Sequence, residues 1–140
     1  MKDIPRSALL LGLAGLIPFY APLLPAVRGW LPLDAFLAYA VVIAGFMAGV
    51  QWGMGVATNT PRGWAVYGVS VLPALWAVLA FIVPRNQASE VLVVAFLAIL
   101  ASDWWHVQAG RLPRWYWRLR ILLTAFVVLA LLGWAFLLAA

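Results

Sequence analysis

A few polar residues that could do chemistry lie within a long apolar chain. Asp103 falls inside a hydrophobic run, and His106 follows about 60° further around the same helix, so their side chains can share a face. A charge there costs about 3 kcal/mol on membrane-insertion scales unless it is paired or hydrated. Gln51, Arg118 and Arg120 are expected at a similar depth. Because the two arginines point to opposite sides of their helix, at most one can readily meet Asp103.

These five residues, called the polar cluster below, have two interpretations. The favoured one is structural: an interfacial ion pair that joins the fourth and fifth helices, since polar residues near span ends commonly pair. The other is a functional pocket for a proton, a headgroup or a small ligand. One histidine and one carboxylate fall short of a zinc site, so neither a metal nor a cofactor is predicted. Paired carboxylates, a serine elbow and phosphate-binding glycine loops are also missing, and we therefore expect no catalytic residues and no enzyme.

Two further patterns could support contacts with a ligand or with another protein. The candidate ligand-contact aromatics are Trp52, Trp76, Trp104 and Trp105. On the second apolar run, Gly45, Gly49 and Gly53 recur every fourth residue and form a groove along one helix face. Such a groove lets a second helix approach closely, which is a main source of helix association in lipid. We favour packing inside the bundle over an interface with a partner.

The composition places these residues in a membrane. The 140 residues are 67% hydrophobic and 9% charged, and the mean hydropathy is +1.04, far outside the range of soluble domains. Lipid can surround apolar surface that a small water-soluble domain could not bury. The net charge of +5 is better explained by lipid headgroups and topology than by nucleic acid, because the basic residues lie between apolar runs.

Five apolar runs predict an all-α, polytopic membrane helical bundle that forms a single domain over residues 1–140. The predicted transmembrane spans are 7–26, 33–57, 63–83, 89–108 and 116–138. Because the connections are short, consecutive helices should run antiparallel and side by side. Pro18, Pro22 and Pro25 should kink or end the first span. Together with Asp3 they also favour a membrane helix over a cleaved signal peptide.

Basic residues are distributed unevenly between the two sides of this predicted bundle. Seven lie on the side of the amino terminus: Lys2, Arg6, Arg62, Arg111, Arg114, Arg118 and Arg120. The remaining two, Arg28 and Arg85, lie on the other side. The positive-inside rule therefore predicts a cytoplasmic amino terminus and a carboxyl terminus on the opposite side.

Short strings in all five spans resemble one family. They are GLIPF at 15–19, GVQWG at 49–53, SVLPAL at 70–75, Asp103, PRWY at 113–116, Leu119-Arg120 and Leu123-Thr124. In order and spacing they resemble the domain-of-unknown-function 3429 family, the transmembrane protein 69-like proteins. The resemblance implies a small multi-pass protein of the bacterial inner (cell) membrane, or of the mitochondrial inner membrane in a eukaryote, with no established activity. The tryptophan-rich sensory and translocator proteins are similar in architecture only.

Three functions follow as hypotheses. The first is a non-enzymatic protein that acts through helix-helix contacts, as an accessory or assembly subunit or a homo-oligomer. Its partners would be the lipid bilayer and another membrane protein or itself, with no nucleic acid. The alternative is a binding or sensory protein for a tetrapyrrole, a quinone or a lipid, which a cavity opening near Asp103 would favour. Proton-coupled transport ranks third, because five spans without a clear internal repeat are few for alternating access.

Overall fold

Helices make up nearly all of the computed structural model, which describes residues 4–59 and 63–139. In chain order they are α1 (Arg6–Ala14), α2 (Ile17–Tyr20), η1 (Ala21–Leu23), α3 (Pro25–Arg28), α4 (Leu33–Ala57), α5 (Trp64–Val78), η2 (Leu79–Phe81), α6 (Arg85–Gln108) and α7 (Arg114–Ala139). Five stretches are long and apolar enough to cross a membrane: Arg6–Leu23, Leu33–Ala57, Trp64–Phe81, Arg85–Gln108 and Arg114–Ala139. The all-α class and five candidate membrane spans are thus confirmed. Which side of the membrane each end occupies stays a prediction.

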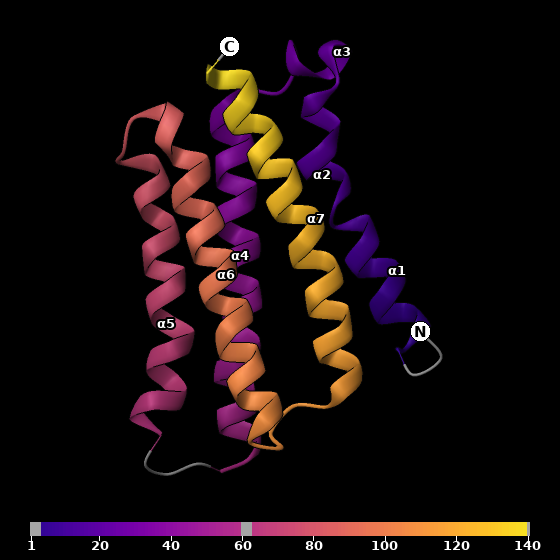
Figure 1. The fold of residues 1–140 in the computed structure, drawn as a ribbon, viewed down its shortest axis with the longest axis vertical. Coiled ribbons are helices and arrows are strands. Elements are labelled where there is room, and N and C mark those ends of the chain that lie inside the picture. The colour runs from indigo at the N-terminus through magenta and orange to yellow at the C-terminus, as the bar shows by residue number, and fades with distance from the viewer. Residues whose placement is uncertain (1–3, 60–62, 140) are drawn as a thin grey trace.

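The first span is broken into short pieces, as its prolines predicted. Helix α1 ends at Ala14, and Pro18 lies in the first turn of α2. Pro22 falls in the 3-10 turn η1, and Pro25 begins α3. Because proline lacks an amide donor and clashes with the preceding turn, it is tolerated at helix starts and interrupts helix interiors. The segment from Arg6 to Arg28, called the arm below, therefore bends along the bundle instead of forming one straight helix (Figure 1).

The fourth span begins earlier than expected. Pro84 precedes the helix in extended conformation, and α6 starts at Arg85 rather than at Ser89. The polar side chains of Asn86 and Gln87 occupy the first turn, where backbone amides have no intrahelical acceptor and polar surroundings are favourable. Across this end of the bundle, Nη1 of Arg85 lies 2.6 Å from Oδ1 of Asp34 at the start of α4, and both side chains are exposed.

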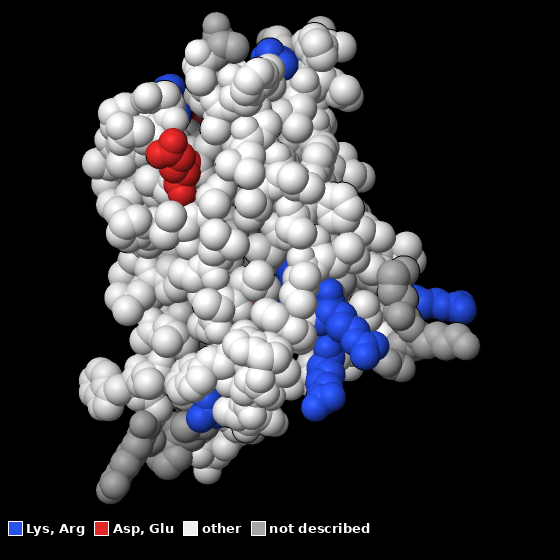
Figure 2. All heavy atoms as spheres, in the orientation of Figure 1, with Lys and Arg blue, Asp and Glu red and all other residues white. Residues whose placement is uncertain are grey.

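The long helices pack in the antiparallel order that the short connections require. Helix α4 contacts α5 and α6, and α6 contacts α7. The arm lies on the far side of α7 from α5, with α1 against α7 and α2 against both α4 and α7 (Figure 1). The start of α1 and the end of α7 lie at opposite ends of the bundle (Figure 1). Figure 2 shows most of the basic side chains visible on this face toward the end that holds the start of α1.

The apolar core combines small residues on α4 with aromatic residues from its neighbours. Ala40, Ala44 and Ala48 are all buried along one face of α4. Phe19 of the arm packs edge-on against Phe96 of α6, with ring centroids 6.1 Å apart. Alanine faces let helices approach closely, and the aromatic rings fill the space between them. This core anchors α2 to α4 and α6, whereas the neighbouring part of the arm leaves the space that forms the candidate site.

Candidate ligand-binding site

Asp103 on α6 and Arg120 on α7 form a buried ion pair. Nε of Arg120 donates a hydrogen bond of 2.6 Å to Oδ2 of Asp103, and the two residues are 2% and 0% exposed. Asp103 lies five residues before the end of α6, about 8 Å into the helix at 1.5 Å per residue. The short turn at 109–113 folds α7 back against α6 and brings the two side chains together. Of the two candidate arginines, Arg120 meets Asp103, and Arg118 lies exposed on α7.

Gln51 adds α4 to this ion pair. Its Nε2 donates to Oδ1 of Asp103 at 2.9 Å and lies 2.6 Å from Oγ of Ser102. Gln51 is fully buried. Both carboxylate oxygens of Asp103 therefore accept a hydrogen bond, which offsets part of the cost of removing the charge from water. Ser102 was not predicted from the sequence, where its only signal was a hydroxyl beside Asp103 on the same helix.

The guanidinium of Arg120 is only partly engaged. Its Nη1 contacts the sulfur of Met47, a weak acceptor, and its Nη2 has no hydrogen-bond partner in the described part of the chain. The ring of Tyr116 lies 5.9 Å from the guanidinium carbon. The Tyr116 hydroxyl is likewise buried and unpartnered among residues 4–59 and 63–139. Tyr116 was also missed, although it stands one helical turn before Arg120 and so shares its face.

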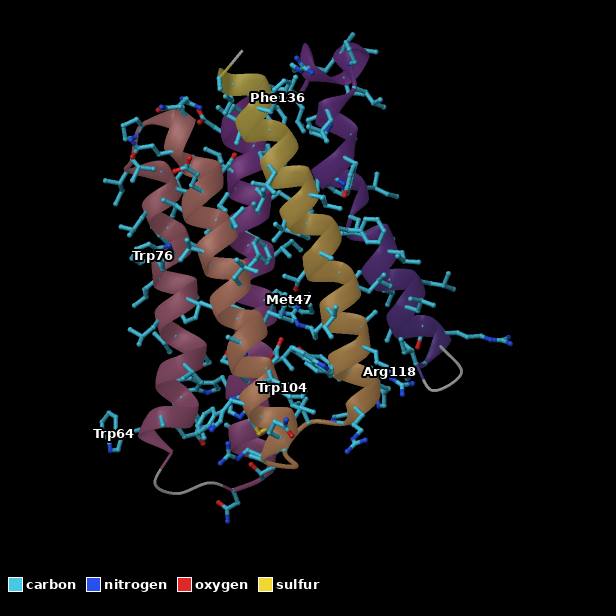
Figure 3. The ribbon with its side chains drawn as sticks, in the orientation of Figure 1. Met47, Trp64, Trp76, Trp104, Arg118 and Phe136 are labelled. Atoms are coloured by element: carbon cyan, nitrogen blue, oxygen red, sulfur yellow. The ribbon has the colours of Figure 1, made fainter. Side chains whose placement is uncertain are left out.

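Arg120, Tyr116 and Met47 line a cavity of about 360 Å³ between the arm, α4 and α7. Tyr116, Arg120 and Thr124, spaced by four along α7, all line it. The rest of the lining is apolar, and includes Met47, which Figure 3 places in the middle of the bundle. Of the lining residues, Leu11 on α1 and Phe46 on α4 are 74% and 65% exposed. The cavity therefore opens sideways between α1 and α4, on the surface that faces lipid in a membrane.

His106 belongs to a separate contact. Its Nδ1 lies 3.3 Å from Nη1 of Arg111 in the turn after α6, and its ring packs on Trp105 with centroids 4.8 Å apart. Asp103 is engaged by α4 and α7 instead, so the two groups do not form the isolated proton-transfer pair on which the transport hypothesis rested. Among the described residues, no group of three or more His, Cys, Asp or Glu side chains could hold a metal ion.

The four candidate tryptophans do not gather around a ligand site. Their contacts are Trp52 with Tyr67, Trp76 with the carbonyl of Val91, Trp104 with Trp117, and Trp105 with His106. Each is at least 40% exposed, and none lines the cavity. Figure 3 places Trp76 in the upper half of α5 and Trp104 near the lower end of α6. These residues lie on outer faces, where amphipathic rings suit a membrane surface, and their role as ligand contacts stays a prediction.

The glycine groove faces outward. A Cβ added at Gly45, Gly49 or Gly53 would meet no other heavy atom within 4 Å, so the favoured packing of this groove inside the bundle is wrong. The inner face of α4 carries Ala44 and Ala48 instead. Each alanine immediately precedes a glycine, and one residue rotates a helix position by about 100°, so both rows cannot face the same neighbour.

Comparisons with known proteins find one family model and two curated relatives that match most of the chain. A family model described as "Protein of unknown function (DUF3429)" matches residues 4–136. The chain is 39% identical to transmembrane protein 69 of Xenopus tropicalis over 140 residues, which cover 95% of this chain and 55% of the relative. It is 31% identical to transmembrane protein 69 of Mus musculus over 137 residues, or 91% of this chain and 55% of the relative. The chain thus spans about half the length of these curated relatives. No solved structure gives a significant match.

Proposed function

The chain belongs to the family described as proteins of unknown function (DUF3429), as the sequence motifs indicated, and because that description supplies no activity, we propose a function from the site itself. The protein is a non-enzymatic membrane protein that binds a hydrophobic small molecule in the cavity between the arm, α4 and α7. We place it in the bacterial inner membrane, or in the mitochondrial inner membrane of a eukaryote. This reverses the order of the sequence-based hypotheses, which ranked helix contacts first.

One observation carries the proposal: Arg120 lines an otherwise mainly apolar cavity, and its buried Nη2 has no acceptor within the described residues. A buried donor left unpaired costs about 1–3 kcal/mol, and more when the group is charged. A ligand that supplied an acceptor would remove this cost. Small-molecule sites are usually apolar pockets with a few placed polar groups, which is the composition of this cavity.

The size and position of the opening fit a molecule that arrives from the membrane. The volume of about 360 Å³ is near the lower end of the range of roughly 300–1,000 Å³ for ligand pockets. The cavity therefore suits one end of a larger amphiphile, whose remaining chain would leave between Leu11 and Phe46. Both rim residues are apolar and exposed, so this chain would pass directly into hydrocarbon.

Two valines on α4 provide the test. Val50 lines the cavity, whereas Val42, two turns away, is 66% exposed and lies outside the cavity lining. Protein purified from membranes in mild detergent should carry a hydrophobic molecule that mass spectrometry detects after extraction. Val50→Phe fills the cavity and should deplete that molecule strongly, and Val42→Phe should leave it unchanged. Equal amounts of extracted molecule in both variants would contradict the proposal.

A second candidate function is a helix-helix interface on the outer face of α4. The specific observation is that Gly45, Gly49 and Gly53 present their backbone to the lipid side, where a helix from a second copy or from another membrane protein could approach closely. Mass measurement of the purified particle tests it. A monomer without any copurifying protein, unchanged by substitutions along this face, would exclude the interface.

A further inference from the structure

The unused hydrogen-bond donors in the cavity define the chemistry of its ligand. Resting on the proposed function, we infer that the ligand presents a neutral carbonyl oxygen to Nη2 of Arg120 and to the hydroxyl of Tyr116. The ligand class is therefore a long apolar molecule with a carbonyl head. Isoprenoid quinones and ester-linked lipids share this chemistry.

Two residues that line the cavity have hydrogen-bond donors without a described acceptor. In Arg120, Nε donates to Asp103 and one N–H group of Nη1 contacts the sulfur of Met47; Nη2, which carries two further N–H groups, has no partner at all among the described residues. Tyr116 contributes one further buried hydroxyl without a partner among the described residues. The two residues stand one turn apart on α7, and both line the cavity. Two donors from the same face point to a ligand atom that accepts more than one hydrogen bond, as a carbonyl oxygen does.

The charges around the cavity favour a neutral ligand. Arg120 is the charged residue in the cavity lining, and its charge is already balanced by Asp103 at 2.6 Å. An anionic ligand would place a second negative charge near the same guanidinium, close to Asp103 and in a medium of low dielectric constant, where like charges repel strongly. A cation would face the guanidinium itself. A neutral acceptor satisfies the donors without disturbing the ion pair.

The arrangement of polar and apolar residues around the cavity favours an amphiphile. The polar lining residues all come from α7, whereas the exposed residues Leu11 and Phe46 come from α1 and α4. A ligand with its carbonyl at Arg120 and its tail toward the rim would keep every apolar group in contact with apolar side chains or lipid. This orientation requires an amphiphile with one polar end, which excludes molecules that are polar along their whole length.

The test compares probes that have the same tail and either carry or lack carbonyl groups. The unmodified protein in detergent would be titrated with a ten-carbon-tailed benzoquinone and with a benzene that carries the same tail. In parallel, ester-linked phosphatidylcholine would be compared with its ether-linked analogue, which lacks the carbonyl oxygens. We expect the carbonyl member of at least one pair to bind about fivefold or more tightly than its analogue, the effect of about one hydrogen bond. The pair that shows the preference identifies the source.

A matched pair of tyrosine variants tests whether Tyr116 causes the preference for the carbonyl probe. Tyr116→Phe removes the hydroxyl and leaves Arg120 with Asp103, so it should lower the preference for the carbonyl probe by about fivefold. Tyr67→Phe, on α5 and outside the cavity lining, should leave that preference unchanged. If neither pair shows a preference in the unmodified protein but Val50→Phe still depletes the extracted molecule, this inference fails and the proposed function stands. If no probe binds saturably and Val50→Phe depletes nothing, both fail.

Discussion

Nε of Arg120 lies 2.6 Å from Oδ2 of Asp103, and this contact joins α7 to α6 within the apolar part of the bundle. Gln51 connects the same carboxylate to α4, so a single side chain receives hydrogen bonds from two neighbouring helices. Three helices thus meet at one polar point. The stability of the bundle should depend strongly on this point and weakly on the exposed charges at its ends.

Removal of one partner of the ion pair should strongly destabilise the bundle. Arg120→Ala leaves Asp103 buried without its counter-charge, and we expect a loss of about 3–5 kcal/mol in stability, because the hydrogen bond from Gln51 alone does not balance the remaining charge. Thermal unfolding in detergent measures this loss. The double variant Asp103→Leu with Arg120→Met should recover most of it, since an apolar pair carries no buried charge. Arg85→Ala, which breaks the exposed contact with Asp34, should change little. Equal losses in the single variants would contradict this account.

Gln51 should stabilise the bundle through its amide. Gln51→Leu keeps the side chain at a similar size but makes it apolar, and so removes the donor that meets Oδ1 of Asp103. We expect a loss of about 1–3 kcal/mol, the cost of leaving one oxygen of a buried carboxylate without a donor. The same unfolding measurement checks it. An unchanged melting temperature would show that another donor reaches Asp103.

The arm should respond to substitution where it touches α7. A Cβ at Gly12 would lie 2.8 Å from Cδ1 of Leu123, so a branched side chain there must displace either the end of the Leu123 side chain or α1 itself. We expect Gly12→Val to raise the rate of proteolysis within the arm. Leu123→Ala frees the space, and the double variant should return toward the original rate, in the manner of a double-mutant cycle. Additive effects of the two substitutions would contradict a direct contact.

The outward glycines should differ from the inward one. Gly49→Leu adds a side chain into open space and should leave the melting temperature of the purified protein almost unchanged. Gly55→Leu should be destabilising, because a Cβ there would lie 2.9 Å from Cε1 of Tyr67 on α5. If Gly49→Leu also reduces the mass of the purified particle, the outer face of α4 is an interface.

The sequence predicted the features that depend on one helix at a time. Apolar length gave the five spans, prolines gave the breaks in the arm, and the spacing of Arg118 and Arg120 allowed only one of them to reach Asp103. The rotation of α4 could not be predicted in the same way. Alanine and glycine rows are both small enough for close packing, and only the positions of α5 and α6 decide which row faces inward.

The cavity could not be predicted from the sequence, for a related reason. It depends on the gap that the bent arm leaves beside α4 and α7, which is a tertiary property of residues far apart in the chain. Tyr116 and Thr124 share a face with Arg120 at helical spacing, and this periodicity was the available signal. The four candidate tryptophans lie outside the cavity, which is lined mainly by aliphatic residues.

The sideways opening between Leu11 and Phe46 changes how occupancy relates to affinity. For a solute that enters from hydrocarbon, the concentration that governs binding is its concentration within the bilayer. Partitioning raises this concentration far above that in water. A site with modest intrinsic affinity can therefore be filled continuously by an abundant membrane solute. Occupancy would then report the composition of the surrounding bilayer, while a titration in dilute aqueous detergent would register the same site as weak.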